Sequence, residues 1–347
     1  MGDHQLLKLV RMRHKALVRV MFVFVVLLAL LNTGESLNTY HEQQKNTMTF
    51  TQFIEEKKRA AKYHDTSLVN ESYATYLKEQ RYFVMPQRDK LYSSLVVGQI
   101  ITIIHYAIPL LLGLAMAGMD QASSFNVAMF KSRFKRRQFF AARYWYGLTC
   151  LLGTTTLGIG ILLLGIFAGV PTEYVGISGL NILGLLMMNL AIDSFLFTVG
   201  IGVGSIFSTL FGMFVFGLFG GWLGASAIQR FMVYNAVNHR SYWSLLPRGD
   251  QLFLLLFILA LTISVAGYWL TRWLFDRISL ENEGDILLLP KLRWVIFVYT
   301  LIVVPYNFGD WLLQNELLSY SVSIIGVLAL GLWWLHRERV QERLMVR

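Results

Sequence analysis

The chain has 347 residues, of which 55% are hydrophobic and only 15% are charged, and its mean hydropathy is +0.50. A soluble protein carries roughly 25% charged residues, so these values exclude a large soluble enzyme and indicate a polytopic membrane protein. The formal net charge of +10 does not by itself indicate nucleic acid, because basic residues in membrane proteins commonly anchor the cytoplasmic loops.

Eight apolar runs along the chain approach the length of a membrane span. A spanning helix needs roughly 20 mainly apolar residues, and the candidates are 16–34, 94–118, 144–168, 177–202, 206–228, 251–271, 294–309 and 318–335. The stretch 176–228 is too long for one helix, so we expect it to fold back near Gly204–Ser208. The sequence therefore predicts an all-α, polytopic helical membrane protein with about eight spans and both termini on one side.

The distribution of Lys and Arg predicts which side that is. With the N-terminus inside, the short inside segments 1–19, 119–143, 272–293 and 336–347 hold 19 Lys and Arg. The short outside loops hold only Arg230, Arg240 and Arg248. Because short cytoplasmic loops are enriched in basic residues, we expect both termini in the cytoplasm and the spans in the cell membrane.

The spans divide the chain into four parts. Residues 1–31 form a basic entry and the first span, and 32–93 form a segment outside the cytoplasm. Residues 94–271 form the core membrane domain, and 272–347 hold a cytoplasmic loop, two further spans and a basic tail. Apolar stripes around Phe53 and Tyr76 predict one or two amphipathic helices in 32–93, packed on the outer face of the membrane domain.

No catalytic motif accompanies these spans. The sequence has no HExxH motif, paired intramembrane aspartates, G-x-S-x-G elbow, histidine cluster or G-x-x-x-x-G-K-[ST] phosphate-binding loop. We therefore expect the chain to bind no cofactor of its own and not to be an enzyme. Its single cysteine, Cys150, excludes an intrachain disulfide.

The few polar residues inside the predicted spans are candidate pathway residues. Asn189 and Asp193 lie four positions apart and therefore on one face of the fourth span. Intramembrane acids are costly and usually face a cavity or a partner, so Asp193 is either a substrate- or proton-pathway residue or an interhelical hydrogen-bonding group. For Asn181 and Asn189, an interhelical hydrogen bond or a position nearer the membrane interface is favoured. His105 is expected to be packed and hydrogen-bonded, because a lone histidine lacks the partners of a metal site.

Glycines recur at Gly-x-x-x-Gly spacing in spans three to five. The pairs are Gly165 with Gly169, Gly200 with Gly204, Gly217 with Gly221, and Gly220 with Gly224. Small residues at this spacing let helices approach closely. Packing within the chain is the favoured interpretation, and a seam between two chains is the alternative.

A basic stretch follows an apolar stripe between spans two and three. The stripe recurs at about helical spacing, so we expect a short amphipathic cytoplasmic helix at about 123–138. A plain loop touching lipid headgroups accounts for the charge but less well for the stripe. Nucleic acid is the least favoured partner, because no RNA- or DNA-binding module accompanies the stretch. The stripe is Phe125, Met129, Phe130 and Phe134, and the basic residues are Lys131, Arg133, Lys135, Arg136 and Arg137.

This layout resembles the ABC-2 type permease family, the membrane subunits of ATP-binding-cassette exporters. The resembling parts are the basic amphipathic entry LLKLVRMRHKALVRVMFVFVVLLALL (6–31), the long outside segment, the stretch FNVAMFKSRFKRRQFFAARYW (125–145) and the glycine-rich spans up to Ile228. The resemblance extends to about Leu270. The pair of spans after Arg272 departs from the six-span core of that family.

The resemblance implies a permease subunit that couples ATP hydrolysis by a separate subunit to transport. Leu6 to Arg19 would be an elbow helix along the inner membrane surface. Phe125 to Arg137 would be the coupling segment that seats in a groove of an ABC ATPase subunit, which would bind ATP and Mg. In particular, Phe130 and Phe134 would fill that groove, and a second copy or a homologous permease would complete a dimer within the membrane lipid.

Two other function classes remain open. An ion- or proton-coupled secondary transporter would use Asp193, and a membrane sensor or immunity protein would bind a ligand through 32–93. The sequence does not specify a substrate, because apolar, aromatic-rich spans suit a lipid, a peptide or a hydrophobic drug equally.

Overall fold

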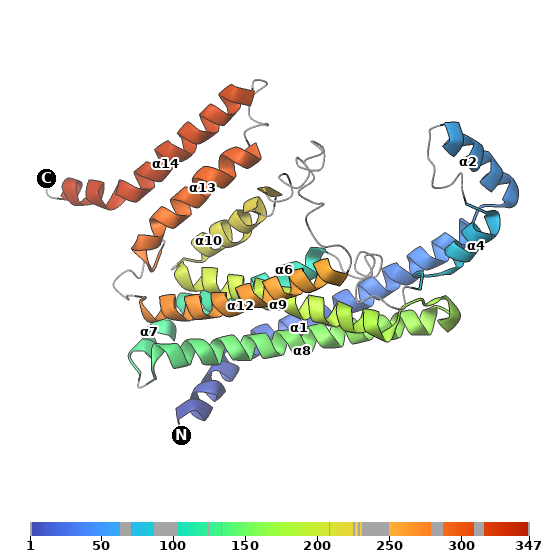
Figure 1. Cartoon of the computed structure of the whole chain (residues 1–347). Helices are drawn as coiled ribbons and strands as arrows, with labels where there is room; N and C mark the ends of the chain where they lie inside the picture. The colour runs from blue at the N-terminus through green and yellow to red at the C-terminus, as the bar shows by residue number, and fades with distance from the viewer. Residues whose placement is uncertain are drawn as a thin grey trace.

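The chain folds almost entirely into helices (Figure 1), as seen in a computed structural model. The model describes residues 2–62, 71–86, 103–123, 125–132, 134–207, 209–224, 226–227, 230, 250–278, 287–308 and 316–345. Within these ranges, β pairing is limited to two isolated bridges, Val84 with Val175 and Phe207 with Leu287. The α-helices are α1 (Gly2–Lys45), α2 (Phe50–Lys62), α4 (Tyr73–Arg81), α6 (Ile103–Ala122), α7 (Phe125–Phe130), α8 (Arg136–Gly169), α9 (Gly179–Ile206), α10 (Leu210–Gly212), α12 (Asp250–Asp276), α13 (Arg293–Phe308) and α14 (Glu316–Met345). Short 3₁₀ turns cover Thr172–Tyr174 and Pro290–Leu292, and a π-helix covers Met213–Phe219.

Five helices of the described chain, α1, α8, α9, α12 and α14, contain segments long and apolar enough to cross a membrane. Three shorter apolar helices, at 107–122, 215–224 and 293–308, overlap the predicted second, fifth and seventh spans. Several long apolar helices indicate a multi-pass membrane protein, as the sequence predicts. The predicted break near Gly204–Ser208 is confirmed, because α9 ends at Ile206. Residues 94–102 of the predicted second span lie outside the described ranges.

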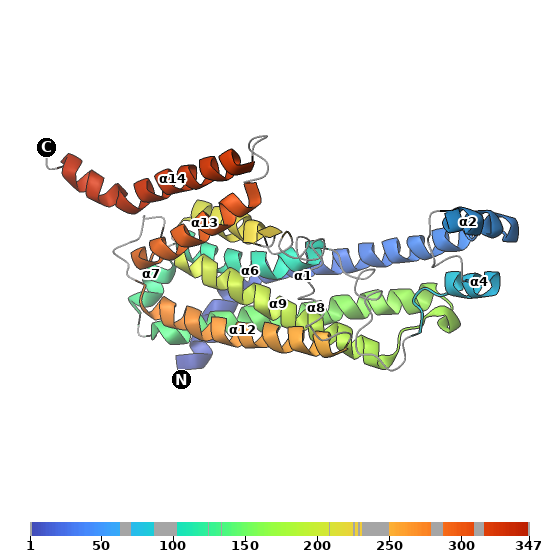
Figure 2. The same ribbon diagram turned by 45° about the horizontal axis from the view of Figure 1, so that its top comes forward.

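The helices form two groups. α1, α6, α8, α9 and α12 run alongside one another as the main bundle, and α10, α13 and α14 form a layer beside it (Figures 1 and 2). This layer is held together by hydrogen bonds as well as apolar contacts: the Asn307 side chain of α13 donates to the carbonyl of Leu223 at 2.9 Å.

Glycines allow the close approach of helices in the bundle. A Cβ atom at Gly113 of α6 would lie 2.5 Å from the backbone nitrogen of Ile201 in α9, and one at Gly165 of α8 would collide with Thr33 of α1. The favoured interpretation of the Gly-x-x-x-Gly spacings, packing within the chain, is therefore confirmed for those in spans three and four. The other members of the Gly-x-x-x-Gly pairs in these two spans, Gly169, Gly200 and Gly204, likewise have an added Cβ within 3.0 Å of a neighbouring helix of the same chain.

α1 is one uninterrupted helix of 44 residues. At 1.5 Å per residue it is roughly 66 Å long, and Figure 1 shows it running the length of the bundle to α2 and α4. Leu6 to Arg19, which the resemblance implies to be an elbow helix, is thus continuous with the first span in one helix. This helix also extends past the expected end of that span, because 32–45 holds no proline and only one glycine, Gly34.

The amphipathic helices predicted for 32–93 correspond to α2 and α4. Phe53 and Tyr76 are buried between them, with ring centroids 5.3 Å apart. After α4, the chain is tied to the α8–α9 connection by the backbone, since Gly176 N donates to Val84 O at 3.1 Å. We call this region, residues 37–62, 71–86 and 170–178, the outer end.

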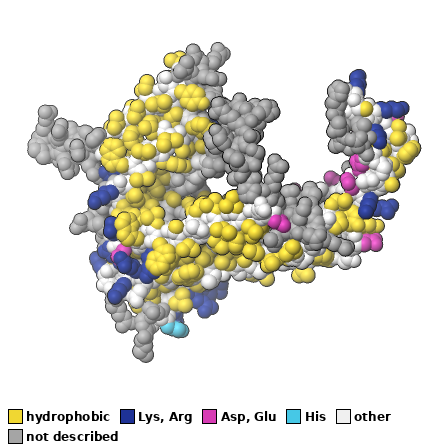
Figure 3. Space-filling model, in the orientation of Figure 1, with side chains coloured by type: hydrophobic (Ala, Val, Ile, Leu, Met, Phe, Trp, Pro, Cys, Tyr) yellow, Lys and Arg dark blue, Asp and Glu magenta, His cyan; other side chains and the backbone are white. Residues whose placement is uncertain are grey.

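Lys and Arg gather at the opposite end of the bundle. Figure 3 shows them where α12 ends and α7 lies, beside a broad apolar surface. We call this region, residues 4–19, 119–145 and 268–278, the basic end.

Candidate functional site

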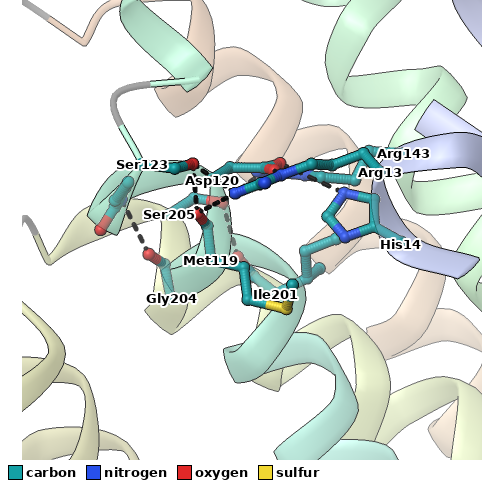
Figure 4. A network of polar contacts seen from close by, with 10 residues as sticks. Arg13, His14, Met119, Asp120, Ser123, Arg143, Ile201, Gly204 and Ser205 are labelled. Atoms are coloured by element: carbon teal, nitrogen blue, oxygen red, sulfur yellow. Dashed lines mark hydrogen bonds and ion pairs between the residues drawn. The ribbon is translucent and has the colours of Figure 1, made fainter. Parts of the chain in front are cut away.

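A buried charged network joins the helices of the basic end (Figure 4). Asp120 of α6 and Arg143 of α8 are fully buried, and Arg143 Nη1 lies 3.2 Å from Asp120 Oδ2. Arg143 Nη2 donates to the hydroxyl of Ser205 in α9 at 2.9 Å. Three helices that are distant in sequence therefore meet at one guanidinium group.

α1 contributes two more basic side chains to this network. His14 is fully buried, with Nε2 3.4 Å from Asp120 Oδ2. Its neighbour Arg13 lies 3.5 Å from Asp120 Oδ1 through Nε and donates to the Met119 carbonyl at 2.6 Å through Nη2. Arg13 also donates to the hydroxyl of Ser123. The network thus fixes α1, α6, α8 and α9 to one another.

Basic groups compensate the buried carboxylate of Asp120 under a cover of aromatic rings. Removing an ion from water costs several kcal/mol, and here one carboxylate faces two guanidinium groups and an imidazole. The Arg143 guanidinium carbon lies 5.1 Å from the ring centroid of Phe275 and 5.6 Å from that of Phe139, which adds cation–π attraction. This arrangement suits a joint that holds helices in one relative position.

α7 packs against this joint through its apolar side. The ring of Phe125 lies 5.8 Å from that of Phe139 and has the Arg13 guanidinium 5.5 Å above it. Phe130 lies 5.4 Å from Phe275 of α12, and Met129 is buried in the core. The predicted apolar stripe therefore exists, but the chain's own bundle covers it.

The same contacts change the setting expected for the phenylalanines. Phe130 and Phe134 are partly buried against the core of this chain, so part of each ring is covered without a partner subunit. The physical reason at Phe130 is that α12 ends beside α7 and supplies Phe275, whose ring packs against it.

The single helix expected at about 123–138 is also corrected. α7 comprises only the six residues Phe125–Phe130, and α8 begins at Arg136. Between them, the Ser132 hydroxyl donates to the Met129 carbonyl at 2.7 Å and accepts from the Phe134 amide at 3.2 Å. Side-chain bonds to the backbone compete with helix formation and here form a turn.

The basic residues of the turn fall into two groups. Lys131 and Lys135 are exposed. Arg136 instead donates to the carbonyls of Asp276 and Ile278 at the end of α12, and Arg137 Nε lies 2.9 Å from the Asp276 carboxylate. Cations are favoured near the last carbonyls of a helix, which explains these contacts. Arg133 lies outside the described residues.

The pathway candidates lie in the interior of the bundle. Asp193 of α9 is fully buried and accepts a hydrogen bond from the Thr155 hydroxyl of α8 at 2.6 Å. Asn189 is buried and donates to the Leu185 carbonyl at 2.7 Å, a bond within its own helix and not between helices. The side chain of His105 lies outside the described part of the structure.

Asn181 has a local structural role. Its backbone amide donates to the Ser178 hydroxyl at 3.2 Å, and its side-chain oxygen accepts from the backbone amide of Ser178 at 2.9 Å. This reciprocal pair is a capping box at the start of α9. These bonds are local to the start of α9, whereas the sequence favoured a hydrogen bond between helices.

The central pair of the network was not predicted from the sequence. Asp120 follows one apolar run and Arg143 begins the next one. Two opposite charges at the facing ends of consecutive predicted spans are a signal for pairing, because an unpaired intramembrane charge is costly. His14 and Ser205 carry no such signal in the sequence.

No family model, curated protein or solved structure matches the chain. Among the described residues, no group of three or more His, Cys, Asp and Glu side chains is placed to hold a metal ion. Function is therefore argued from the geometry of the basic end and of the bundle interior.

Proposed function

We propose that the chain is the permease subunit of an ABC exporter, driven by a separate ATP-hydrolysing subunit that docks at the basic end. The observation that carries the proposal is the position of α7 and the turn after it. Their apolar side is fixed to α1, α8 and α12, while Lys131 and Lys135 face outward. An element held in this way transmits a displacement applied to its exposed side.

The buried network supplies the next step of the proposed mechanism. ATP and Mg, bound by the partner, would close two partner subunits and shift α7. Arg13 contacts both Phe125 of α7 and Asp120, so the shift would reach α1, α6, α8 and α9 as rigid bodies. The spans would then rock between inward- and outward-facing arrangements.

The arrangement of the chain ends agrees with cytoplasmic termini. The start of α1 and the end of α14 both lie toward the basic end (Figure 1), which the positive-inside rule assigns to the cytoplasm. A dimer with a second copy or a homologous permease would use lipid-facing surfaces, because the glycine spacings of spans three and four are occupied within the chain.

The test is purification from the native membrane in mild detergent, with mass spectrometry of the proteins that accompany the chain. We expect a stoichiometric partner with a phosphate-binding loop. The double variant Lys131→Glu and Lys135→Glu should lose this partner, because it reverses two exposed charges of the turn without touching a buried contact. The matched control is Lys58→Glu with Lys62→Glu, two exposed lysines of α2 at the outer end.

Two results would contradict the proposal. One is a chain that purifies without any ATPase, and the other is equal partner retention in the two double variants. Arg136→Glu is a poor probe, because Arg136 binds the end of α12 and its loss disturbs the chain itself.

A second candidate function rests on Asp193. A fully buried carboxylate between two candidate spans suits an ion- or proton-coupled secondary transporter. This candidate predicts that Asp193→Asn abolishes transport driven by an ion gradient and that no ATPase is needed. Loss of transport in Lys131→Glu with Lys135→Glu, but not in Asp193→Asn, would favour the ATP-driven permease.

A further inference from the structure

The last turns of α12 carry aromatic and basic side chains on their outer face. Trp269 and Trp273 lie one turn apart and are 59% and 45% exposed. The Arg272 guanidinium carbon lies 5.2 Å from the ring of Trp269, and that of Arg277 lies 3.8 Å from the ring of Trp273. Two cations are thus held against two outward-facing indole rings.

Within the described residues, neither arginine is neutralised by a carboxylate. No ion pair within 4.0 Å joins Arg272 or Arg277 to a carboxylate of the described residues, and Asp276 pairs with Arg137 instead. Guanidinium groups with unused donors match the oxygens of a phosphate, which they bind in a bidentate manner.

The position of this face identifies the source of the phosphate. Ile258 and Val265 continue the outer face of α12 and are each 59% exposed, so the face is apolar along most of the helix. The tryptophans and arginines follow where this apolar surface ends, at the basic end. Indole rings at that position lie at headgroup depth in a bilayer, with basic side chains reaching the polar layer.

We infer that this face, formed by Trp269, Arg272, Trp273 and Arg277, binds the phosphate of an anionic phospholipid headgroup. The site is lateral, on the surface that faces lipid, whereas the proposed ATPase surface is the turn that holds Lys131 and Lys135. The inference does not depend on the proposed function, because a transporter of any class has a lipid-facing surface.

The test is native mass spectrometry of the full chain with dioleoyl phosphatidylglycerol or dioleoyl phosphatidylcholine added at equal concentration. We expect phosphatidylglycerol to be retained in preference to phosphatidylcholine. The double variant Arg272→Gln and Arg277→Gln should weaken this retention by roughly tenfold or more, since each basic residue near a bilayer surface contributes about fivefold. The matched control, Lys131→Gln with Lys135→Gln, removes the same charge from the end of the bundle and should change retention less than about twofold.

Three results would overturn the inference. They are equal retention of the two lipids, equal weakening in the two double variants, and displacement of the lipid by millimolar inorganic phosphate. Equal retention of the two lipids would mean that binding does not depend on the headgroup charge. Equal weakening in the two double variants would mean that only the net charge of the protein matters, and displacement by phosphate would mean that the site binds free phosphate. The double variant Arg272→Lys and Arg277→Lys keeps both charges but removes the planar guanidinium groups. We expect its retention of phosphatidylglycerol to lie between that of the unmodified chain and that of the double glutamine variant.

Discussion

The two ends of the molecule are held together by different physical means. At the basic end, a buried carboxylate and buried cations join four helices, and Asp120 and Arg143 have no exposed surface. At the outer end, tyrosine and phenylalanine rings pack between α1, α2 and α4. Backbone hydrogen bonds from Phe83 N to Tyr174 O and from Gly176 N to Val84 O complete the attachment of the outer end.

This difference has a consequence for movement. Neutral packing and backbone hydrogen bonds hold one shape over a wide range of salt and pH. A buried charge network is costly to leave half-formed, so its helices keep their arrangement or change it together. The basic end is therefore suited to switching between discrete arrangements of its helices, whereas the outer end is suited to keeping a single conformation.

The largest effect should come from breaking the buried pair. Arg143→Met leaves Asp120 buried with weaker compensation and should lower the free energy of unfolding by about 3–5 kcal/mol. Thermal unfolding in detergent, followed by circular dichroism, measures this loss.

The double variant Asp120→Asn with Arg143→Met separates pairing from packing. Because it removes both charges, it should be more stable than Arg143→Met alone. Additive losses from the two substitutions would show that the pair is not coupled, and the contrast between the two ends would then fail.

This pair also shows where sequence-based prediction stops. Helices were predictable because apolar runs of about 20 residues have few alternatives in a membrane, and the break after α9 was predictable from length alone. The meeting of Asp120, Arg143, His14 and Ser205 was not predicted, because it depends on which helices lie side by side. The periodicity of apolar residues predicts each helix, but it does not predict which helices pack against one another.

α7 illustrates a second limit. The stripe that includes Phe125 and Phe130 was identified correctly from its spacing, but spacing does not tell whether the apolar side meets a partner or the same chain. Phe275, more than 140 positions further along the chain, decides this by packing against Phe130. Similarly, the 44-residue length of α1 was missed, because the end of the apolar run after Leu31 does not end the helix.

A smaller and local effect is expected at the outer end. A Cβ atom at Gly176 would collide with the carbonyl of Val84 and lie 2.6 Å from the nitrogen of Pro86, and the backbone cannot rotate away as a side chain does. Gly176→Ala should therefore weaken the attachment of residues 71–86 by about 1–3 kcal/mol. Hydrogen exchange at the amides of α4 measures this change.

Gly179 provides the control for this substitution. It lies three residues further on, has nothing within 4 Å of an added Cβ, and begins α9. Gly179→Ala should leave hydrogen exchange in α4 unchanged. Faster exchange at the basic end in Gly176→Ala would contradict the view that the two ends are held independently.

The smallest effect is expected for the ion pair of Arg137 with Asp276. Its nitrogen–oxygen distance of 2.9 Å is shorter than the 3.2 Å of the buried Arg143–Asp120 pair, but its side chains are 56% and 34% exposed. Exposed pairs typically contribute about 0.2–1 kcal/mol, and at 1 M salt the screening length falls to about 3 Å. A double-mutant cycle with Arg137→Gln and Asp276→Asn should therefore give a coupling energy below about 1 kcal/mol that disappears at 1 M salt. A coupling energy above about 1 kcal/mol that persists at 1 M salt would mean that water is excluded from this pair, as it is from Asp120. The buried network would then extend to the surface where the partner is proposed to dock.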